Sequence, residues 1–332
     1  MEESNPIKMV NQKVADVKTF PVPFALGEIK ENISTTTTTT TTAAKPSKEQ
    51  IINQAFQFHS KGNIKEAAKY YQYFIDQGFK DHRVFSNYGV LLKNLGKLKE
   101  AESFYRKAIE LKPDYAEALS NHGIILNDLG KLQEAELSTR KAIEINPDFA
   151  EAHLNLGIIL KDLGKSKDAE FSYRKAIEIH HDYAEAHLNL GNLFNDIGKL
   201  QDAEFSYRKA IEIKTDFADA HNNLGNILRD LGKLKEAELS YRQAIEIKPD
   251  YAEPHSNLGN TLRDLGKLKE AELSTRKAIA IKPDYKEAHC NLGIILKDLG
   301  NLKESELSYR KAIEIKPDYA EAFWNLSLLE LL

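Results

Sequence analysis

A period of 34 residues constrains this sequence more than any other feature. Prolines recur on this grid at Pro113, Pro147, Pro249, Pro283 and Pro317, and two further grid points carry His181 and Thr215. Sliding the sequence by 34 residues superimposes nearly everything from 82 to 319. A repeat of this length is one supersecondary element that cannot bury its apolar face alone, so successive copies must stack. We therefore expect a linear array rather than two or three globular domains.

Each repeat contains two helical patterns, numbered as positions 1 to 34 of residues 218–251. Positions 4, 7, 8 and 11 are apolar or small in the first pattern, and positions 20, 24, 27 and 28 in the second. Both spacings follow the period of an α-helix. Small residues at positions 8, 20 and 27 let the two helices approach closely, and the proline at position 32 ends the hairpin. The pattern predicts an all-α solenoid.

The ends of the predicted helices carry their own signals. Glycine at position 15, as in Gly130 and Gly164, suits the left-handed conformation that follows a helix. We also expect Asp114 to cap the first helix of the third repeat, because Glu117 follows three residues later as in a capping box.

The repeat pattern divides the sequence into two segments. The first, 1–47, contains eight consecutive threonines at 35–42 and is expected to be a disordered segment with a linker. Its one apolar patch, at 20–26, is either part of this disorder, a segment lying on the first repeat, or a docking motif for a partner. The second segment holds the repeats at 48–81, 82–115, 116–149, 150–183, 184–217, 218–251, 252–285 and 286–319 and a partial ninth at 320–332.

The period, the small residues at positions 8, 20 and 27, the aromatic residue near position 24 and the proline at position 32 resemble the tetratricopeptide repeat (TPR). The resemblance covers residues 48–332. It implies a right-handed TPR superhelix, an α-solenoid of about eight helix-turn-helix repeats plus a partial ninth, whose first helices line a concave groove. Proteins of this family act mostly as adaptors that assemble protein complexes.

Position 6 is asparagine in every repeat. The residues are Asn53, Asn87, Asn121, Asn155, Asn189, Asn223, Asn257, Asn291 and Asn325. Asparagine is a mediocre helix former, and positions 5, 9 and 12 vary while position 6 does not. The column resembles the asparagine ladder inside the TPR superhelix of the O-linked N-acetylglucosamine transferases, whose amides grip the backbone of extended peptides. The resemblance ends there, because this sequence stops where the transferase lobes would have to begin.

Two interpretations of the column are open. An amide offers donors and an acceptor, so it can satisfy a peptide C=O and N–H together. Stacked helices lie about 8–10 Å apart and an extended peptide rises about 3.3 Å per residue, so successive asparagines would meet about every third ligand residue. Alternatively, the amides form hydrogen bonds between repeats.

The predicted peptide-binding face extends beyond position 6. It adds Asn192, Asn226 and Asn260 at position 9 and Arg229 and Arg263 at position 12, opposite aspartates at position 13. Position 5 lacks the lysine with which some TPR domains clamp a terminal carboxylate, so such a tail is not the expected ligand.

Composition and motifs favour a binding protein over an enzyme. The net charge of −4 gives no reason to expect nucleic acid or an anionic membrane as partner. Histidines at position 4 are one repeat apart, too far to converge on a metal, and no nucleophile, metalloprotease or dinucleotide motif is present. We expect no catalytic residue, metal or cofactor.

The expected location is the cytoplasm. The single Cys290 excludes an intramolecular disulfide framework and indicates a reducing compartment. The amino terminus lacks the pattern of a secretory signal, and no apolar run approaches the roughly 20 residues that span a bilayer.

The last helical pattern is apolar on most faces. Phe323, Trp324, Leu328 and Leu332 would be exposed unless a second copy or further material covers them. Three functions follow as hypotheses. The leading one is a non-catalytic scaffold that binds extended polypeptides in the asparagine-lined groove. The others are the substrate-recognition module of a modifying transferase and a self-assembling architectural protein.

Overall fold

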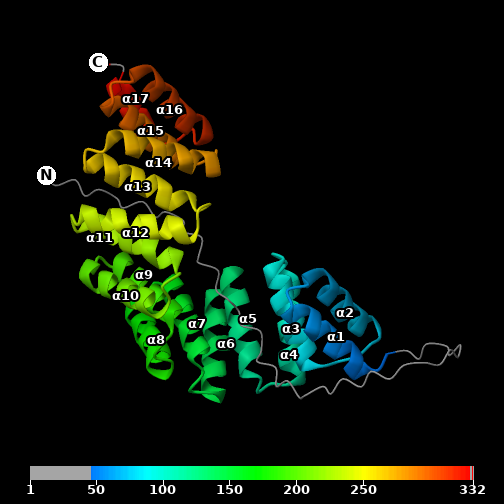
Figure 1. The fold of residues 1–332 in the computed structure, drawn as a ribbon. Coiled ribbons are helices and arrows are strands. Elements are labelled where there is room, and N and C mark those ends of the chain that lie inside the picture. The colour runs from blue at the N-terminus through cyan, green and yellow to red at the C-terminus, as the bar shows by residue number, and fades with distance from the viewer. Residues whose placement is uncertain (1–45, 330, 332) are drawn as a thin grey trace, which may run out of the picture. The chain divides into compact units, whose positions relative to one another are not determined.

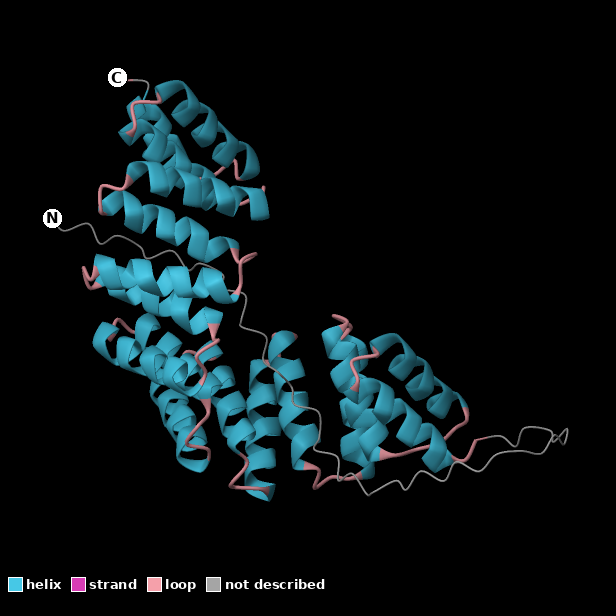
Figure 2. Ribbon diagram, viewed as in Figure 1, coloured by secondary structure: helices cyan, strands magenta, loops and turns pink. Residues whose placement is uncertain are grey.

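The computed structural model describes residues 46–329 and 331. Within these residues every regular element is an α-helix, which confirms the predicted all-α fold (Figures 1 and 2). The chain forms two compact units, unit 1 ending at Ile179 and unit 2 beginning at His180. The predictions for residues 1–45 lie outside the described residues.

Helices alternate as the first and second members of successive hairpins. Unit 1 contains α1 (Lys48–Ser60), α2 (Ile64–Asp76), α3 (His82–Asn94), α4 (Leu98–Leu111), α5 (Ala116–Asp128), α6 (Leu132–Ile145), α7 (Ala150–Asp162) and α8 (Ser166–Ile179). Unit 2 contains α9 (Ala184–Asp196), α10 (Leu200–Ile213), α11 (Ala218–Asp230), α12 (Leu234–Ile247), α13 (Ala252–Asp264), α14 (Leu268–Ile281), α15 (Lys286–Asp298), α16 (Leu302–Ile315) and α17 (Ala320–Leu329).

The turn inside each hairpin is built on the predicted glycine. Gly130 has a φ of 75°, in the left-handed region that a residue with a Cβ avoids. The Lys131 N–H donates to the Leu126 carbonyl and the Gly130 N–H to the Asn127 carbonyl, both at 2.8 Å. These two bonds satisfy carbonyls left free at the end of α5 and turn the chain into α6.

The glycine at position 8 sets how closely the two helices of a hairpin pack. A Cβ added to Gly157 would lie 2.4 Å from Cε1 of Tyr173 at position 24. In the third repeat, a Cβ on Gly123 would lie 2.0 Å from Oγ1 of Thr139. Neither approach is possible for a larger residue, which confirms the close contact predicted from small residues at this position.

The predicted capping box at Asp114 is wrong. The N-cap of α5 is Tyr115, and no side chain caps the helix. The Tyr115 ring is buried and contacts edge-on the His82 ring at the start of the same repeat, with centroids 5.1 Å apart. This contact fixes Tyr115 at the helix entrance and leaves Asp114 one residue outside. A capping box is present instead at α1, between Ser47 and Gln50.

Successive hairpins stack through their first helices. In unit 1, α1, α3, α5 and α7 contact one another in order, and in unit 2 the same holds from α9 through α11, α13 and α15 to α17. No two consecutive second helices make such contacts within the described residues. The first helices therefore line the inner side of each unit and the second helices its outer side.

Ion pairs tie neighbouring second helices together on the outer side. Lysine at position 16 reaches back to glutamate at position 21 of the preceding repeat, as Lys233 does to Glu204 and Lys267 to Glu238, both at 2.8 Å. Asn301 holds this position in the eighth repeat. Exposed pairs of this kind contribute about 0–1 kcal/mol each.

One hairpin contains a buried histidine at a position where the fourth to ninth repeats have leucine. His122 lies at position 7 of α5, and its Nδ1 is 3.2 Å from Ser138 Oγ. Its Nε2 is buried without a partner. Burial, with a smaller contribution from Arg106, lowers the pKa of His122 to about 4.

The His122→Leu variant should lose less stability than the native chain as the pH falls. In the unfolded chain this histidine is protonated below its ordinary pKa of about 6.5, whereas in the folded chain it is protonated only below about pH 4. The native chain therefore loses stability over this window, by up to about 3 kcal/mol from this residue. Urea unfolding at pH 7.5, 5.5 and 4.5 measures it. Native and variant curves that stay parallel would contradict the assignment.

Candidate functional site

The asparagine ladder, defined as the position-6 residues from Asn87 to Asn325, lies on the first helices and so on the inner side of each unit. In unit 1, Asn87 and Asn155 are buried and Asn121 is half-buried. In unit 2, Asn189, Asn223, Asn257, Asn291 and Asn325 are all half-buried. Asn53 in α1 is exposed.

Four ladder amides donate to the preceding repeat, those of Asn155, Asn223, Asn257 and Asn291. Asn155 Nδ2 donates to Ser120 Oγ at 2.9 Å, and Asn291 Nδ2 donates to Ser256 Oγ at 3.0 Å. Both acceptors are at position 5, one residue before the ladder asparagine of the previous first helix. The amide N–H groups therefore join adjacent repeats, as the second interpretation of the column requires.

The ladder in unit 2 uses a second amide as its acceptor. Asn223 Nδ2 donates to Asn192 Oδ1 at 3.0 Å. Asn257 Nδ2 donates to Asn226 Oδ1 at 3.1 Å and to Asn222 Oδ1 at 3.2 Å. Positions 6 and 9, which the sequence brings onto one face, are thus directly bonded across repeats.

Three ladder amides donate to their own helix. Asn87 Nδ2 bonds the Arg83 carbonyl at 2.9 Å, Asn189 Nδ2 the Glu185 carbonyl at 2.8 Å and Asn325 Nδ2 the Glu321 carbonyl at 2.9 Å. Each acceptor is four residues earlier, an ordinary local bond for asparagine in a helix.

Tyrosines from the second helices complete the network in unit 2. Tyr207 Oη donates to Asn192 Oδ1 at 2.8 Å, and Tyr241 Oη donates to Asn226 Oδ1 at 2.7 Å. Each of these oxygens thus accepts from a tyrosine and from the next ladder asparagine. Because two donors from the protein hold the Oδ1 atom of Asn192 and of Asn226, the Nδ2 group of each points away from those donors.

Asn260, at position 9 of the seventh repeat, has no tyrosine at position 24 to donate to it. Its Oδ1 is buried with no hydrogen-bond partner. Position 24 of this repeat is Thr275, whose Oγ1 donates to the Ala271 carbonyl at 2.9 Å, and Asn291 donates to Ser256 instead. This coupling is not among the predictions from the sequence, although tyrosine at position 24 and asparagine at position 9 occur together in the fifth and sixth repeats and are a signal for it.

The charged residues beside the ladder pair with one another. Arg263 lies 2.9 Å from Asp264 Oδ1 and 3.9 Å from Asp298 Oδ2 of the next repeat. Asn127 Nδ2 similarly donates to Asp162 Oδ2 at 2.7 Å. Positions 12 and 13 therefore form a second link between repeats, rather than two unpaired rows. Arg229 is half-buried on α11.

The histidines at position 4 and the single cysteine have surroundings that indicate a structural role. His153 and His289 at position 4 donate from Nε2 to the carbonyls of Pro147 and Pro283, both at 2.9 Å. Cys290 is buried, and burial, reinforced by Glu321, raises the pKa of its thiol to about 12. A thiolate is the reactive form, so this cysteine is poorly suited to chemistry.

No group of three histidine, cysteine, aspartate or glutamate residues within 46–329 is arranged to hold a metal ion. Among the same residues, none of the helices has the length and apolar character needed to cross a membrane.

The carboxyl-terminal helix exposes large apolar side chains. Trp324 is 68% exposed and Phe323 46% exposed, and Leu328 is 38% exposed. Leu332, the fourth residue predicted for this surface, lies outside the described residues.

Comparison with known families identifies the repeats. A model described as TPR repeat matches residues 191–228, 225–266 and 259–300, and one described as Tetratricopeptide repeat matches 287–319. Residues 53–178 match the model of the Cilia and flagella-associated protein 70 middle TPR-like domain. A search of the curated proteins finds no match.

Two solved structures are similar to this chain. The crystal structure of YrrB, a TPR protein with an unusual peptide-binding site, is 26% identical with a TM-score of 0.48, covering 56% of this chain and 96% of that one. The APC/C hetero-tetramer Cut9-Hcn1 has a TM-score of 0.63 at 15% identity, covering 85% of this chain. This chain spans 55% of that one, and the likeness concerns the fold alone.

The tyrosine bond to the amide can be tested with a matched pair of variants. Tyr241→Phe removes the donor to Asn226 Oδ1 and should cost about 0.5–1.5 kcal/mol of unfolding free energy. Tyr105→Phe should be neutral or slightly stabilising, because Tyr105 Oη is buried without a partner and position 9 of its repeat is Val90. Urea unfolding measures both, and equal costs would contradict the network.

Proposed function

Because the chain is a tetratricopeptide repeat protein, we propose that it is a non-catalytic scaffold that binds extended polypeptide segments along the asparagine ladder. The proposed contact residues are Asn87, Asn121, Asn155, Asn189, Asn223, Asn257 and Asn291, with Asn192, Asn226, Asn260, Arg229 and Arg263 beside them. The observation that carries the proposal is the fixed orientation of the amides in unit 2.

That orientation leaves complementary groups for a peptide backbone. Asn257 uses its Nδ2 group in the two bonds to the preceding repeat, so its Oδ1 remains as an acceptor. Asn226 uses its Oδ1 in accepting from Tyr241 and Asn257, so its Nδ2 group remains as a donor. One acceptor and one donor match the N–H and C=O of a peptide unit. Asn192 and Asn223 form a similar arrangement one repeat earlier, where Asn223 Oδ1 also accepts from Asn222 Nδ2 at 3.3 Å.

The bonds within the protein favour this use of the amides. A side chain already held in one orientation loses little conformational entropy when a ligand binds. The inter-repeat bonds and peptide binding are therefore compatible. The inter-repeat bonds fix the orientation of each amide, and a peptide would bind the amide oxygen or Nδ2 group that these bonds leave unused. Since only backbone groups are contacted, the ladder makes little demand on the ligand's side chains.

The double variant Asn192→Asp with Asn226→Asp tests this function without removing the inter-repeat bonds. Aspartate keeps an oxygen for Tyr207, Tyr241 and the next ladder asparagine, but replaces the outward N–H donor by an acceptor. Binding of a permanently unfolded polypeptide, reduced and carboxymethylated α-lactalbumin, should weaken by about tenfold or more. Fluorescence anisotropy with the labelled polypeptide gives the Kd.

The control is Gln201→Glu with Gln243→Glu, the same change from amide to acid on exposed positions of second helices. Equal weakening in both double variants would reveal a general effect of charge and contradict the assigned contacts. A native chain that binds no unfolded polypeptide would contradict the function itself.

Self-association through α17 is a second candidate, favoured by the exposure of Phe323, Trp324 and Leu328. The mass measured by light scattering should rise with concentration in the native chain and stay at the monomer value in Trp324→Glu with Leu328→Glu. Leu239→Glu, at a similarly exposed position 64% accessible on α12, is the control. A native chain that stays monomeric at every concentration rules the candidate out.

A further inference from the structure

A row of large apolar side chains lies on the outer side of the repeats. We call it the outer column: Leu137, Phe171, Phe205, Leu239, Leu273 and Leu307, all at position 22 of second helices. They are between 62% and 73% exposed. Isolated exposed apolar residues are common on protein surfaces, whereas the same position in six consecutive repeats asks for an explanation.

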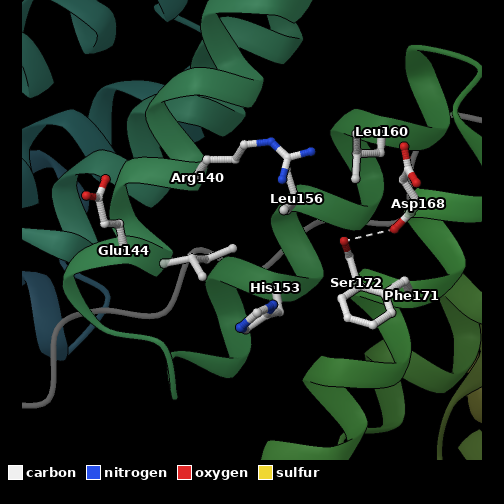
Figure 3. A pocket seen from close by; sticks show the side chains of 9 residues that line it. Arg140, Glu144, His153, Leu156, Leu160, Asp168, Phe171 and Ser172 are labelled. Carbon is white, nitrogen blue, oxygen red and sulfur yellow. Dashed lines mark hydrogen bonds between the residues drawn. The ribbon is translucent and has the colours of Figure 1, made fainter.

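A pocket opens beside Phe171 in unit 1. It has a volume of about 390 Å³ and lies where α6, α7 and α8 meet. Ile143, Leu156, Leu160 and Phe171 give it apolar walls, and Arg140 and Asp168 stand among its polar residues. Figure 3 shows these side chains projecting from the three helices. The pocket forms here because the backbones of consecutive second helices do not pack closely against each other.

The same pocket recurs in unit 2 at equivalent positions. Ile279, Leu292 and Leu307 replace Ile143, Leu156 and Phe171, and the volume is about 430 Å³. The recurrence shows that the pocket is a property of the repeat and not of one local distortion.

The arginine at the pocket is already paired. Arg140 donates to Glu136 Oε1 from Nε at 3.1 Å and from Nη2 at 2.9 Å, and Lys165 Nζ lies 2.7 Å from Glu136 Oε2. The pocket therefore presents an apolar interior with a neutralised Arg140 and the carboxylates of Glu144 and Asp168 at its rim. This chemistry suits an aliphatic or aromatic side chain rather than an ionic ligand.

We propose that the pocket at Phe171 is a docking site for the chain's own residues 20–26. This segment, Phe-Pro-Val-Pro-Phe-Ala-Leu, is the one apolar patch in the sequence before the repeats. Its four large apolar residues, Phe20, Val22, Phe24 and Leu26, have the chemistry that the pocket accepts, and Leu137 of the outer column adds a further exposed apolar side chain in the same unit.

The length of the intervening chain fits this docking. Residues 27–45 separate the segment from the first described repeat. A random chain of that length has an r.m.s. span of roughly 22–26 Å and an extended limit of roughly 65 Å. The pocket lies about three repeats along unit 1, on the order of 30 Å at about 10 Å per stacked layer. A tether of matching span gives an effective concentration in the millimolar range, so even weak docking is populated.

Disulfide trapping in the full chain tests the proposal. Val22→Cys is combined with Glu144→Cys, an exposed residue that lines the pocket. Cys290 is buried, with a thiol pKa raised to about 12, so it does not compete. In a dilute sample under a glutathione redox buffer, the intramolecular disulfide should form about tenfold faster than in the control pair Val22→Cys with Asp162→Cys. Asp162 is exposed at the end of α7, a first helix.

A third variant separates docking from chance encounter. Adding Phe171→Asp, which changes an exposed side chain, should bring the rate down to that of the control pair while the helical circular dichroism stays unchanged. Equal rates for the two cysteine pairs, or no effect of Phe171→Asp, would overturn the proposal. Disulfides between molecules that form faster at higher concentration would also overturn it, and would assign the pocket to a second copy. Because Phe171 and Glu144 are on second helices, away from the ladder asparagines, none of these outcomes bears on peptide binding at the ladder.

Discussion

The contact between the position-8 glycine and the residue at position 24 underlies the rest of the structure. A Cβ on Gly191 would lie 2.6 Å from Cε1 of Tyr207, so only glycine admits the ring. Because the ring enters, its hydroxyl reaches across the hairpin to Asn192, and Asn192 in turn accepts from Asn223. Packing inside one repeat thus fixes an amide that joins it to the next. Replacing the glycine would disturb both the hairpin and the face on which the ladder lies.

The sequence predicted what is encoded within one hairpin. The period placed the helices, and the glycines at position 15 have the positive φ that their place after a helix requires. The ladder asparagines lie on the first helices as expected. Capping at Asp114 was predicted wrongly, because burial of Tyr115 overrode a local side-chain preference. A short-range motif is decided by tertiary packing when the two compete.

Contacts between repeats were harder to predict. The acceptors Ser120 and Ser256 lie 35 residues before the asparagines that donate to them. This spacing does not reveal which side-chain rotamers bring the hydroxyl and the amide into contact. The pockets of the outer side likewise depend on how far consecutive second helices separate within a unit. Near-identical repeats give identical local signals, so differences between interfaces come from single substitutions, such as Thr275 for tyrosine.

The last interface of unit 2 responds differently to tension. In the sixth, seventh and eighth repeats the ladder asparagine donates to the preceding repeat, as Asn291 does to Ser256. The ladder asparagine of the ninth repeat, Asn325, makes its 2.9 Å bond within its own helix and lies 3.8 Å from Cys290 Sγ of the eighth. When the two ends of a stack are pulled apart, every interface bears the same force, and the one with the weakest links opens first. A stretched unit 2 would thus release α17 first, while the repeats joined by amide bonds stay stacked.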